Sequence, residues 1–325
     1  MARVPTGQLI GKFLAGSVRG KTSAFPRQPT KGSRSRPVHH DQGSGWDPSL
    51  AQWKAILLVS PLVAALLLFM VYPLAKLLID SVTTGNGLTN YVEALSSSAV
   101  RRATVTTLAM SAIVTVTSVV MGGSVAWALR TVRHGVIRVV LWTSVLMPLW
   151  MGVVVKNYTL VLLLARNGAI NKFLMLIGVV DEPLQLLYTP VAVVVGMVYA
   201  MLPYAVFSMY AVLVTIDLDV LNASRVMGAT VLRSMITVAL PLALPGIVAS
   251  AAIVFCISVG FYVTPILLGG AQSPFLASVI DADIFSYFNY PQAASVSVLL
   301  LMIALVILVI TIKVVGAAQL RRVAV

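Results

Sequence analysis

Long apolar runs are the feature that most limits what this chain can fold into. The bilayer core is about 30 Å thick, so a helix needs roughly 20 apolar residues to cross it. Backbone groups inside lipid must be hydrogen-bonded within their own segment, which a helix achieves. The sequence therefore predicts an all-α integral membrane protein with six transmembrane helices, at approximately 55–79, 104–129, 136–155, 190–214, 240–264 and 295–315.

Composition supports this class of protein and argues against nucleic-acid binding. The chain is 59% hydrophobic and 10% charged, which leaves too few charges to solvate a soluble globular surface. The net charge of +13 is distributed over the N-terminal segment and the loops, as basic loops at a lipid surface require. The one cysteine, Cys256, lies inside an apolar run and has no partner for an intrachain disulfide. We expect contact with membrane lipid and none with nucleic acid.

A further apolar stretch, residues 157–178, is not expected to cross the bilayer. A charged residue within a membrane helix costs about 2.5 kcal/mol or more on insertion scales. We therefore interpret this stretch as two short interfacial pieces, because its middle contains Arg166, Asn167, Gly168, Asn171 and Lys172. The Gly-Gly and Ser-Pro steps of residues 267–274 likewise close the fifth span.

The distribution of positive charge predicts the orientation. Placing both termini in the cytoplasm gives the inner side most of the Lys and Arg residues, as the positive-inside rule requires. In this topology residues 217–239 lie in the cytoplasm, whereas residues 156–189 and 269–294 lie outside.

The N-terminal segment, residues 1–52, differs in composition from the membrane domain of residues 53–325. It is rich in Gly, Ser, Pro and Arg and lacks a continuous apolar stretch, so we expect a disordered, basic cytoplasmic tail. Its Arg-rich, acid-poor start also resembles an organellar transit peptide, which is the alternative interpretation. His39 and His40 lack further ligands at tetrahedral spacing, and we expect no metal site.

The polar segment between the fourth and fifth spans predicts a helix, a turn and a second helix. Asp217 or Asp219 can cap the first helix, and Gly228 permits the turn that ends it. Thr230 can cap a second short helix that runs through Thr237, before two prolines begin the next span. Small and basic residues of this segment offer a face that another protein can approach closely. The alternative is an amphipathic connector resting on the lipid surface.

Here the sequence resembles the coupling-loop motif of ABC importer permeases, whose pattern runs Glu-Ala-Ala, three residues, Gly, and a spacer ending in Leu-Pro. The matching residues are "NASRVMGATVLRSMITVALPLALPGI" at 222–247, with Asn222 standing where the family usually has Glu. The resemblance covers roughly residues 53–318. Three further stretches, 166–174, 186–217 and 260–270, resemble the first permease subunit of spermidine/putrescine-type importers.

The resemblance implies a type I ABC importer permease fold in the bacterial inner membrane, with both termini cytoplasmic. It implies three kinds of partner: cytoplasmic ATP-binding subunits, a second permease subunit and an extracytoplasmic solute-binding protein. The chain itself would then have no catalytic residues and no cofactor, since ATP is bound by the partner ATPase. The residues expected to couple to that ATPase are Asn222, Ala223, Ser224, Arg225, Gly228 and Ala229.

Candidate pathway residues are polar or amphipathic groups within or beside the spans. We expect a translocation route to include Tyr199, Tyr204, Ser258 and Tyr262, and the alternative is that they form interhelical hydrogen bonds or interface aromatics. On the outer side, residues 265–294 contain Asp281 and Asp283 without Lys or Arg, together with Tyr287 and Tyr290. These groups would attract a cation by charge and by cation–π contact, or would dock the delivery protein.

The substrate expectation follows from the resemblance. It favours a polyamine such as spermidine or putrescine, or a related small cationic solute, with organic phosphonates, opines and ferric iron as alternatives. An ion-coupled secondary transporter usually carries ionisable residues inside the membrane for ion coupling, and the predicted spans contain no Asp or Glu. A membrane scaffold would tolerate the same spans but gives no reason for the polar segment at 217–239.

Overall fold

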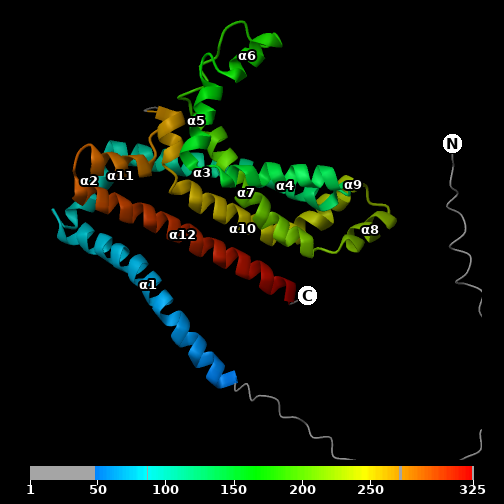
Figure 1. The fold of residues 1–325 in the computed structure, drawn as a ribbon, viewed down its shortest axis with the longest axis horizontal. Coiled ribbons are helices and arrows are strands. Elements are labelled where there is room, and N and C mark those ends of the chain that lie inside the picture. The colour runs from blue at the N-terminus through cyan, green and yellow to red at the C-terminus, as the bar shows by residue number, and fades with distance from the viewer. Residues whose placement is uncertain (1–47, 86, 271–272, 324–325) are drawn as a thin grey trace, which may run out of the picture. The chain divides into compact units, whose positions relative to one another are not determined.

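The computed structural model describes residues 48–85, 87–270 and 273–323. Every regular element in this part of the chain is helical (Figure 1). In chain order the elements are α1 (Pro48–Thr83), α2 (Thr89–Ser96), α3 (Ser98–Thr131), α4 (Gly135–Trp150), α5 (Val153–Leu164), α6 (Ala169–Leu176), α7 (Pro190–Thr215), α8 (Leu218–Val226), α9 (Val231–Ser234), the π-helical turn η1 (Met235–Ala239), α10 (Leu240–Val259), the second π-helical turn η2 (Pro265–Gly269), α11 (Leu276–Phe285) and α12 (Tyr290–Val323).

The chain divides into two units, residues 1–62 and 63–325. The described part of the first unit is the beginning of α1, which starts at Pro48 rather than at the predicted boundary of residue 53. The remainder of the predicted N-terminal tail, residues 1–47, lies outside the described residues. The second unit contains the packed helices and both polar segments discussed below.

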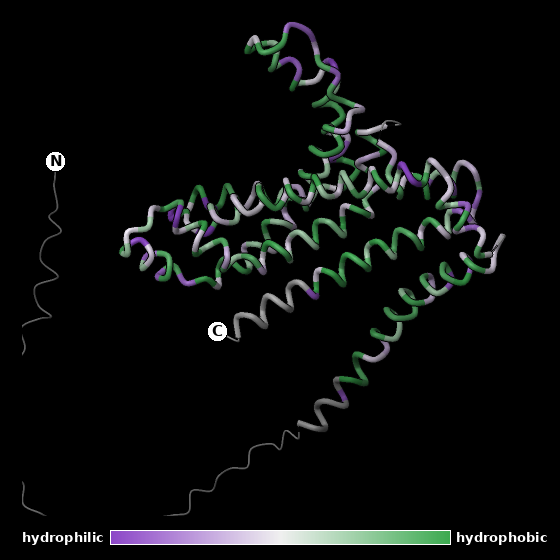
Figure 2. Tube along the Cα trace, turned by 180° about the vertical axis from the view of Figure 1, so that it is seen from behind, coloured by the Kyte–Doolittle hydropathy of each residue, from purple (hydrophilic) through white to green (hydrophobic). Residues whose placement is uncertain are grey.

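Six helical stretches in the described residues are long and apolar enough to cross a membrane: Ile56–Thr83, Ser98–Thr131, Val153–Leu176, Pro190–Thr215, Val231–Val259 and Tyr290–Lys313. Five correspond to predicted spans. Hydrophobic residues run along these helices, and hydrophilic residues gather at their ends and in the connections (Figure 2). The prediction of an all-α protein with six membrane-crossing helices is confirmed at the level of helix length and composition.

The predicted third span, 136–155, is wrong in its bounds. Helix α4 ends at Trp150 and α5 begins at Val153, because Met151 and Gly152 adopt extended backbone between them. This is one break in the helical backbone. A second break follows α5 at residues 165–168, where the polar residues of the sequence predicted an interruption. The prediction that residues 157–178 do not cross the bilayer is also wrong by length and composition, because Val153–Leu176, which contains α5 and α6, is one of the six candidate spans, whereas Gly135–Trp150 is only a shorter apolar helix.

Helices α3, α7 and α10 form the core of the second unit. Glycines let these helices approach closely: a Cβ on Gly122 of α3 would lie 2.7 Å from the Ala205 Cβ of α7. A Cβ on Gly246 of α10 would lie 2.9 Å from the Val212 Cβ of α7. Small residues at helix crossings are the usual means of tight packing in membranes, where no hydrophobic force drives helices together.

The start of the fifth span also differs from the prediction. The second short helix was expected to end at Thr237, but α9 continues through η1 into α10 without a turn. The Leu240 N–H donates to the Met235 carbonyl, five residues back, and Pro241 has no N–H to contribute to the α-helical pattern. The predicted end at residue 264 is also wrong, because α10 ends at Val259 and Gly260 follows in a turn.

Asn171 of α6 organises the segment between α5 and α7. Its side chain is fully buried and its amide donates to the carbonyls of Ala165, at 3.1 Å, and Leu184, at 2.9 Å. The Leu184 N–H returns a bond to the Asn171 Oδ1 at 3.0 Å. A residue that the sequence marks as a polar interruption is therefore the centre of a local hydrogen-bonded structure.

Candidate functional site

The segment at 217–239, between α7 and α10, is built on local capping chemistry. The Asp217 carboxylate accepts from the Asp219 N–H at 2.9 Å and caps α8. The Thr230 hydroxyl oxygen accepts from the Arg233 N–H at 3.3 Å and caps α9. Both are side-chain caps for backbone donors that lack a partner within the helix. The predicted caps at Asp217 and Thr230 are confirmed.

Gly228 ends α8 in a Schellman motif. The Gly228 N–H donates to the Arg225 carbonyl at 2.9 Å, and the Ala229 N–H donates to the Ser224 carbonyl at 3.1 Å. Gly228 has a φ of +89°, a conformation that residues with a Cβ rarely adopt. A Cβ built there meets no atom of this chain within 4 Å. The turn therefore requires glycine for its backbone, while the space around it is open.

A hydroxyl pair holds the two short helices together. The Ser224 and Ser234 hydroxyl oxygens lie 2.6 Å apart, and Ser224 also donates to the Leu221 carbonyl at 2.8 Å. Both serines are buried. The structure therefore places Ser224 inside the loop, whereas the other predicted coupling residues are exposed or half-buried: Asn222, Ala223, Arg225, Gly228 and Ala229.

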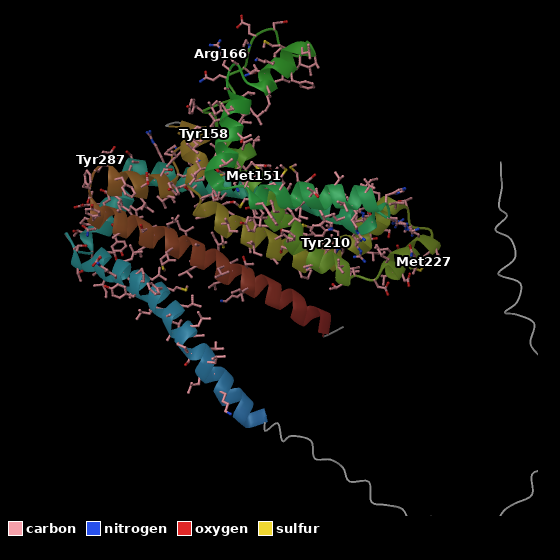
Figure 3. The ribbon with its side chains drawn as sticks, viewed as in Figure 1. Met151, Tyr158, Arg166, Tyr210, Met227 and Tyr287 are labelled. Carbon is pink, nitrogen blue, oxygen red and sulfur yellow. The ribbon has the colours of Figure 1, made fainter. Side chains whose placement is uncertain are left out.

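The most exposed apolar side chains of the loop were not predicted from the sequence. Val226 is 88% exposed and Met227 is 84% exposed, directly before Gly228. Figure 3 shows Met227 at the opposite end of the helices from Tyr287. Two adjacent, almost fully exposed apolar residues on a capped turn are typical of a contact with a protein or a membrane surface rather than of a solvated loop. Their position before the helix-ending glycine was the available sequence signal.

Arg130, at the end of α3, anchors the start of this loop. One terminal guanidinium nitrogen of Arg130 donates to the Ile216 carbonyl, directly after α7. The neighbouring Asp217 carboxylate attracts the same guanidinium. The loop is therefore tied both to α7, which leads into it, and to α3, so that displacement of the loop acts on two core helices.

The predicted pathway residues do not form one cluster. Tyr199 is half-buried on α7 and its hydroxyl donates to the Met151 sulfur at 3.9 Å, whereas Tyr204 on the same helix is exposed. Five residues along a helix correspond to a rotation of about 140° after one full turn, so these two tyrosines occupy different faces. Ser258 is buried and its hydroxyl has no partner among the described residues. Tyr262 is exposed just beyond the end of α10.

A buried hydrogen bond joins α5 to Thr264, the residue directly before η2. The Thr264 hydroxyl donates to the Asn157 Oδ1 at 2.9 Å, and the Asn157 Nδ2 donates to the Val153 carbonyl at 2.9 Å. The preceding residue on α5, Lys156, also has a mostly buried side chain. None of these three residues was predicted as a site residue. The signal available in the sequence was a Lys-Asn pair inside an otherwise apolar run.

The acidic residues of the predicted outer segment lie on α11, so this segment is partly helical. Asp281 is half-buried, and Asp283 is only 5% exposed. The Asp283 Oδ2 atom has no hydrogen-bond partner among the described residues, and burial raises the pKa of this carboxyl group. Tyr287 and Tyr290 are exposed after α11. The two tyrosine side chains are therefore accessible at the surface, whereas the Asp283 side chain is not.

Six helices long and apolar enough to cross a membrane define a multi-pass membrane protein, and a capped, exposed loop lies between two of its core helices. Comparison with known proteins makes this class specific. The chain belongs to the family of binding-protein-dependent transport system inner membrane components, which matches residues 55–324. It is an ABC importer permease of the inner membrane.

Named relatives support the same assignment. The spermidine/putrescine transport system permease protein PotB of Escherichia coli (strain K12) is 33% identical over 193 residues, covering 59% of this chain and 70% of the relative. PotB of Haemophilus influenzae is 30% identical over 203 residues, covering 62% of this chain and 71% of the relative. The sulfate transport system permease protein CysT of Salmonella typhimurium is 27% identical over 191 residues, covering 58% of this chain and 67% of the relative.

The fold is shared with a solved transporter. The crystal structure of a bacterial ABC transporter involved in the import of the acidic polysaccharide alginate contains a chain with a TM-score of 0.67 and 18% identity, covering 84% of this chain and 98% of that one. At this level of identity the likeness shows the fold alone.

Proposed function

We propose that the exposed turn at the end of α8 docks onto a cytoplasmic ATPase and transmits its movement to the membrane helices. The observation that carries this proposal is the loop itself. It is capped at both helices and closed by an internal hydroxyl pair, and it presents Val226 and Met227 to the outside. A loop that is rigid within itself and apolar at its tip is suited to transmit force from a partner.

Continuity with the core helices gives the coupling mechanism. Helix α7 ends at Thr215, one residue before the carbonyl bound by Arg130, and α9 runs through η1 into α10 without a break. ATP binding that closes the ATPases would move the loop, and the loop would tilt α7 and α10 together. Alternating access is then a population shift between two packings of the same helices.

The partners follow from the family and from the loop. We propose one or more cytoplasmic ATP-binding subunits, a second permease subunit that completes the pathway, and an extracytoplasmic solute-binding protein. ATP is bound and hydrolysed by the partner, and this chain binds no cofactor and catalyses no reaction. A solved alginate transporter in complex with a substrate-bound periplasmic protein shares this fold and provides a precedent for the delivery step.

The proposed substrate is a polyamine, spermidine or putrescine, because the PotB relatives are named for these solutes. Phosphonates, opines and ferric iron remain the alternatives from the wider resemblance. The sulfate permease relative illustrates that the fold serves anions as well.

Reconstituted transport tests this proposal. The chain, its second permease and the ATPase are placed in proteoliposomes with the solute-binding protein, and labelled spermidine uptake is measured with ATP or with an imposed proton or sodium gradient. We expect uptake that requires ATP. Uptake driven by an ion gradient without ATP would establish a secondary transporter instead. ATP-driven uptake of a phosphonate or ferric iron, with none of a polyamine, would overturn the substrate and retain the permease.

A further inference from the structure

A groove lined by α3, α7, η1 and α10 lies at the end of these helices that adjoins the loop. Its volume is about 590 Å³, and its lining contains no polar side chain other than Ser124 and Trp127. The Ser124 hydroxyl already donates to the Val120 carbonyl at 2.9 Å. Each of the lining elements belongs to a stretch that is long and apolar enough to cross a membrane. The groove is therefore suited to hydrocarbon and offers few hydrogen-bonding groups to a polar solute.

The length of the groove corresponds to one leaflet of a bilayer. Along η1 and α10 the lining runs from Met235 to Ile247, which is about 18 Å at a rise of about 1.5 Å per residue. The hydrocarbon core of a bilayer is about 30 Å thick, so the acyl chains of one leaflet span about 15 Å. The groove therefore has the length of one acyl chain rather than that of a whole membrane span.

One end of the groove carries a positive charge. The lining residues Ile236, Leu240, Ala243 and Ile247 follow one another at intervals of three or four residues, as on one face of a helix. One further step of three residues along this face, towards the N-terminus, reaches Arg233. The Arg233 side chain is exposed and makes no ion pair among the described residues. The apolar face therefore ends in an accessible cation.

The α3 side of the groove ends in a similar way. Trp127 lines the groove, and Arg130 follows three residues later. The Arg130 guanidinium is already held by the Ile216 carbonyl and attracted by Asp217, so Arg233 is the better placed of the two for an external anion. Tryptophan and arginine next to an apolar stretch are typical of the depth at which lipid headgroups lie.

We propose that the groove holds one acyl chain of an anionic phospholipid of the surrounding membrane, with the lipid phosphate bound by Arg233. A phospholipid combines the two groups that the groove can accept, a hydrocarbon chain and an anion at the end of that chain. Basic pockets between membrane helices on the cytoplasmic side bind anionic headgroups in the same way. The inference rests on the proposed function only in placing the loop, and hence Arg233, on the cytoplasmic side.

Photoreactive lipids test this site in the assembled complex. The chain, its second permease and the ATPase are placed in proteoliposomes containing either phosphatidylglycerol or phosphatidylcholine, each with the same photoreactive acyl chain. Mass spectrometry identifies the labelled residues after illumination. The two lipids differ in net charge, and one interfacial cation favours the anionic lipid by about fivefold. We expect phosphatidylglycerol to label the groove residues of α3 and α10 more than phosphatidylcholine by about this factor.

Two pairs of variants separate the headgroup contact from the chain contact. Arg233→Gln should abolish the preference for phosphatidylglycerol, whereas Arg225→Gln, the same change at an exposed arginine of α8, should retain it. Ser124→Phe fills the groove and should remove most of the labelling by either lipid. Ser144→Phe on α4 should leave the labelling unchanged. It is the matched control, because both serines are exposed and donate to the carbonyl four residues back at 2.9 Å.

The outcomes distinguish the lipid site from its alternatives. Equal labelling by the two lipids, in the wild type and in Arg233→Gln, indicates ordinary contact with membrane hydrocarbon and overturns the site. Groove residues that stay unlabelled in the assembled complex, while other spans are labelled, indicate that a partner protein covers the groove, which also overturns it. Selective labelling in a complex without ATP-driven uptake retains the lipid site and contradicts the proposed function instead.

Discussion

Replacing Gly228 separates the folding requirement of the loop from its docking requirement. A residue with a Cβ at a φ of +89° is strained by about 1–2 kcal/mol. Nothing in this chain lies within 4 Å of the added Cβ, so no steric clash within the chain adds to that cost. Gly228→Ala should therefore weaken the α8 cap by this amount and leave the membrane helices folded.

Gly178 offers a matched control. It has a φ of +70°, a Cβ built there also meets nothing within 4 Å, and it is exposed in the segment after α6. Ala or Asp at Gly178 should cost about the same local strain as at Gly228. The two positions differ only in the surface that they face, so a difference in transport reports docking rather than folding.

Gly228→Asp adds a charge to the proposed contact. If the turn docks into a partner, that charge is buried without a counter-ion, which costs roughly 3–5 kcal/mol and corresponds to a loss of about a hundredfold or more in association. We expect ATP-driven uptake to fall accordingly for Gly228→Asp and more modestly for Gly228→Ala, with near-wild-type uptake for both Gly178 variants.

The assay combines uptake in proteoliposomes, recovery of the ATPase in pull-downs and the melting temperature of each purified complex. Similar melting temperatures at the two positions, with transport lost only at Gly228, support docking. If the Gly228→Asp complex transports solute and recovers the ATPase to the same extent as the Gly178→Asp complex, the reasoning is refuted. The segment is then a simple connector.

Three further predictions concern contacts around the two polar segments. Arg130→Gln removes the guanidinium bond at the start of the loop, and hydrogen exchange at residues 217–239 should accelerate while that in the core of α3 stays unchanged; equal exchange in both proteins contradicts the anchor. Ser224→Ala and Ser234→Ala should each destabilise the complex by about 1 kcal/mol, with a double variant costing less than their sum, because the hydroxyls are paired; strict additivity contradicts the pair. Burial raises the pKa of Asp283 above its ordinary value of 3.8, so the folded state binds its proton more tightly than the unfolded chain. Stability should therefore be highest below pH 3.8 for this group and decline as pH rises to the raised pKa; Asp283→Asn should flatten this part of the pH profile relative to Asp281→Asn, and an unchanged profile contradicts the burial argument.

Features that depend on local chemistry were predictable from the sequence. The six apolar helices follow from segment length and composition, and the caps at Asp217 and Thr230 follow from side chains that bond backbone donors two or three residues away. The glycine-ended turn at Gly228 is likewise a local backbone requirement. None of these depends on where the rest of the chain folds.

Features that depend on tertiary packing were not predictable. The Asn157–Thr264 bond joins residues 107 positions apart, so neither the burial of Asn157 nor that of Lys156 can be inferred from the apolar run in which they occur. The break at Met151 and Gly152 lies inside an apolar run, where Pro148 and Gly152 were the available breaking signals. Asp283 is acidic within the mainly apolar helix α11, and its burial depends on how α11 packs against α3 and α12.

Site-directed cross-linking between the loop and the ATPase tests the central claim most directly. Cys256 is first replaced by serine, after which Met227→Cys is paired with single cysteines introduced around the surface of the ATPase. Tyr287→Cys, at the opposite end of the helices, is the control (Figure 3). We predict a disulfide between residue 227 and the ATPase in the assembled complex, with a yield that changes when ATP is added. We predict no disulfide between residue 287 and the ATPase. An ATPase that cross-links to residue 287, or to neither position in a complex that still transports, would contradict docking of this loop.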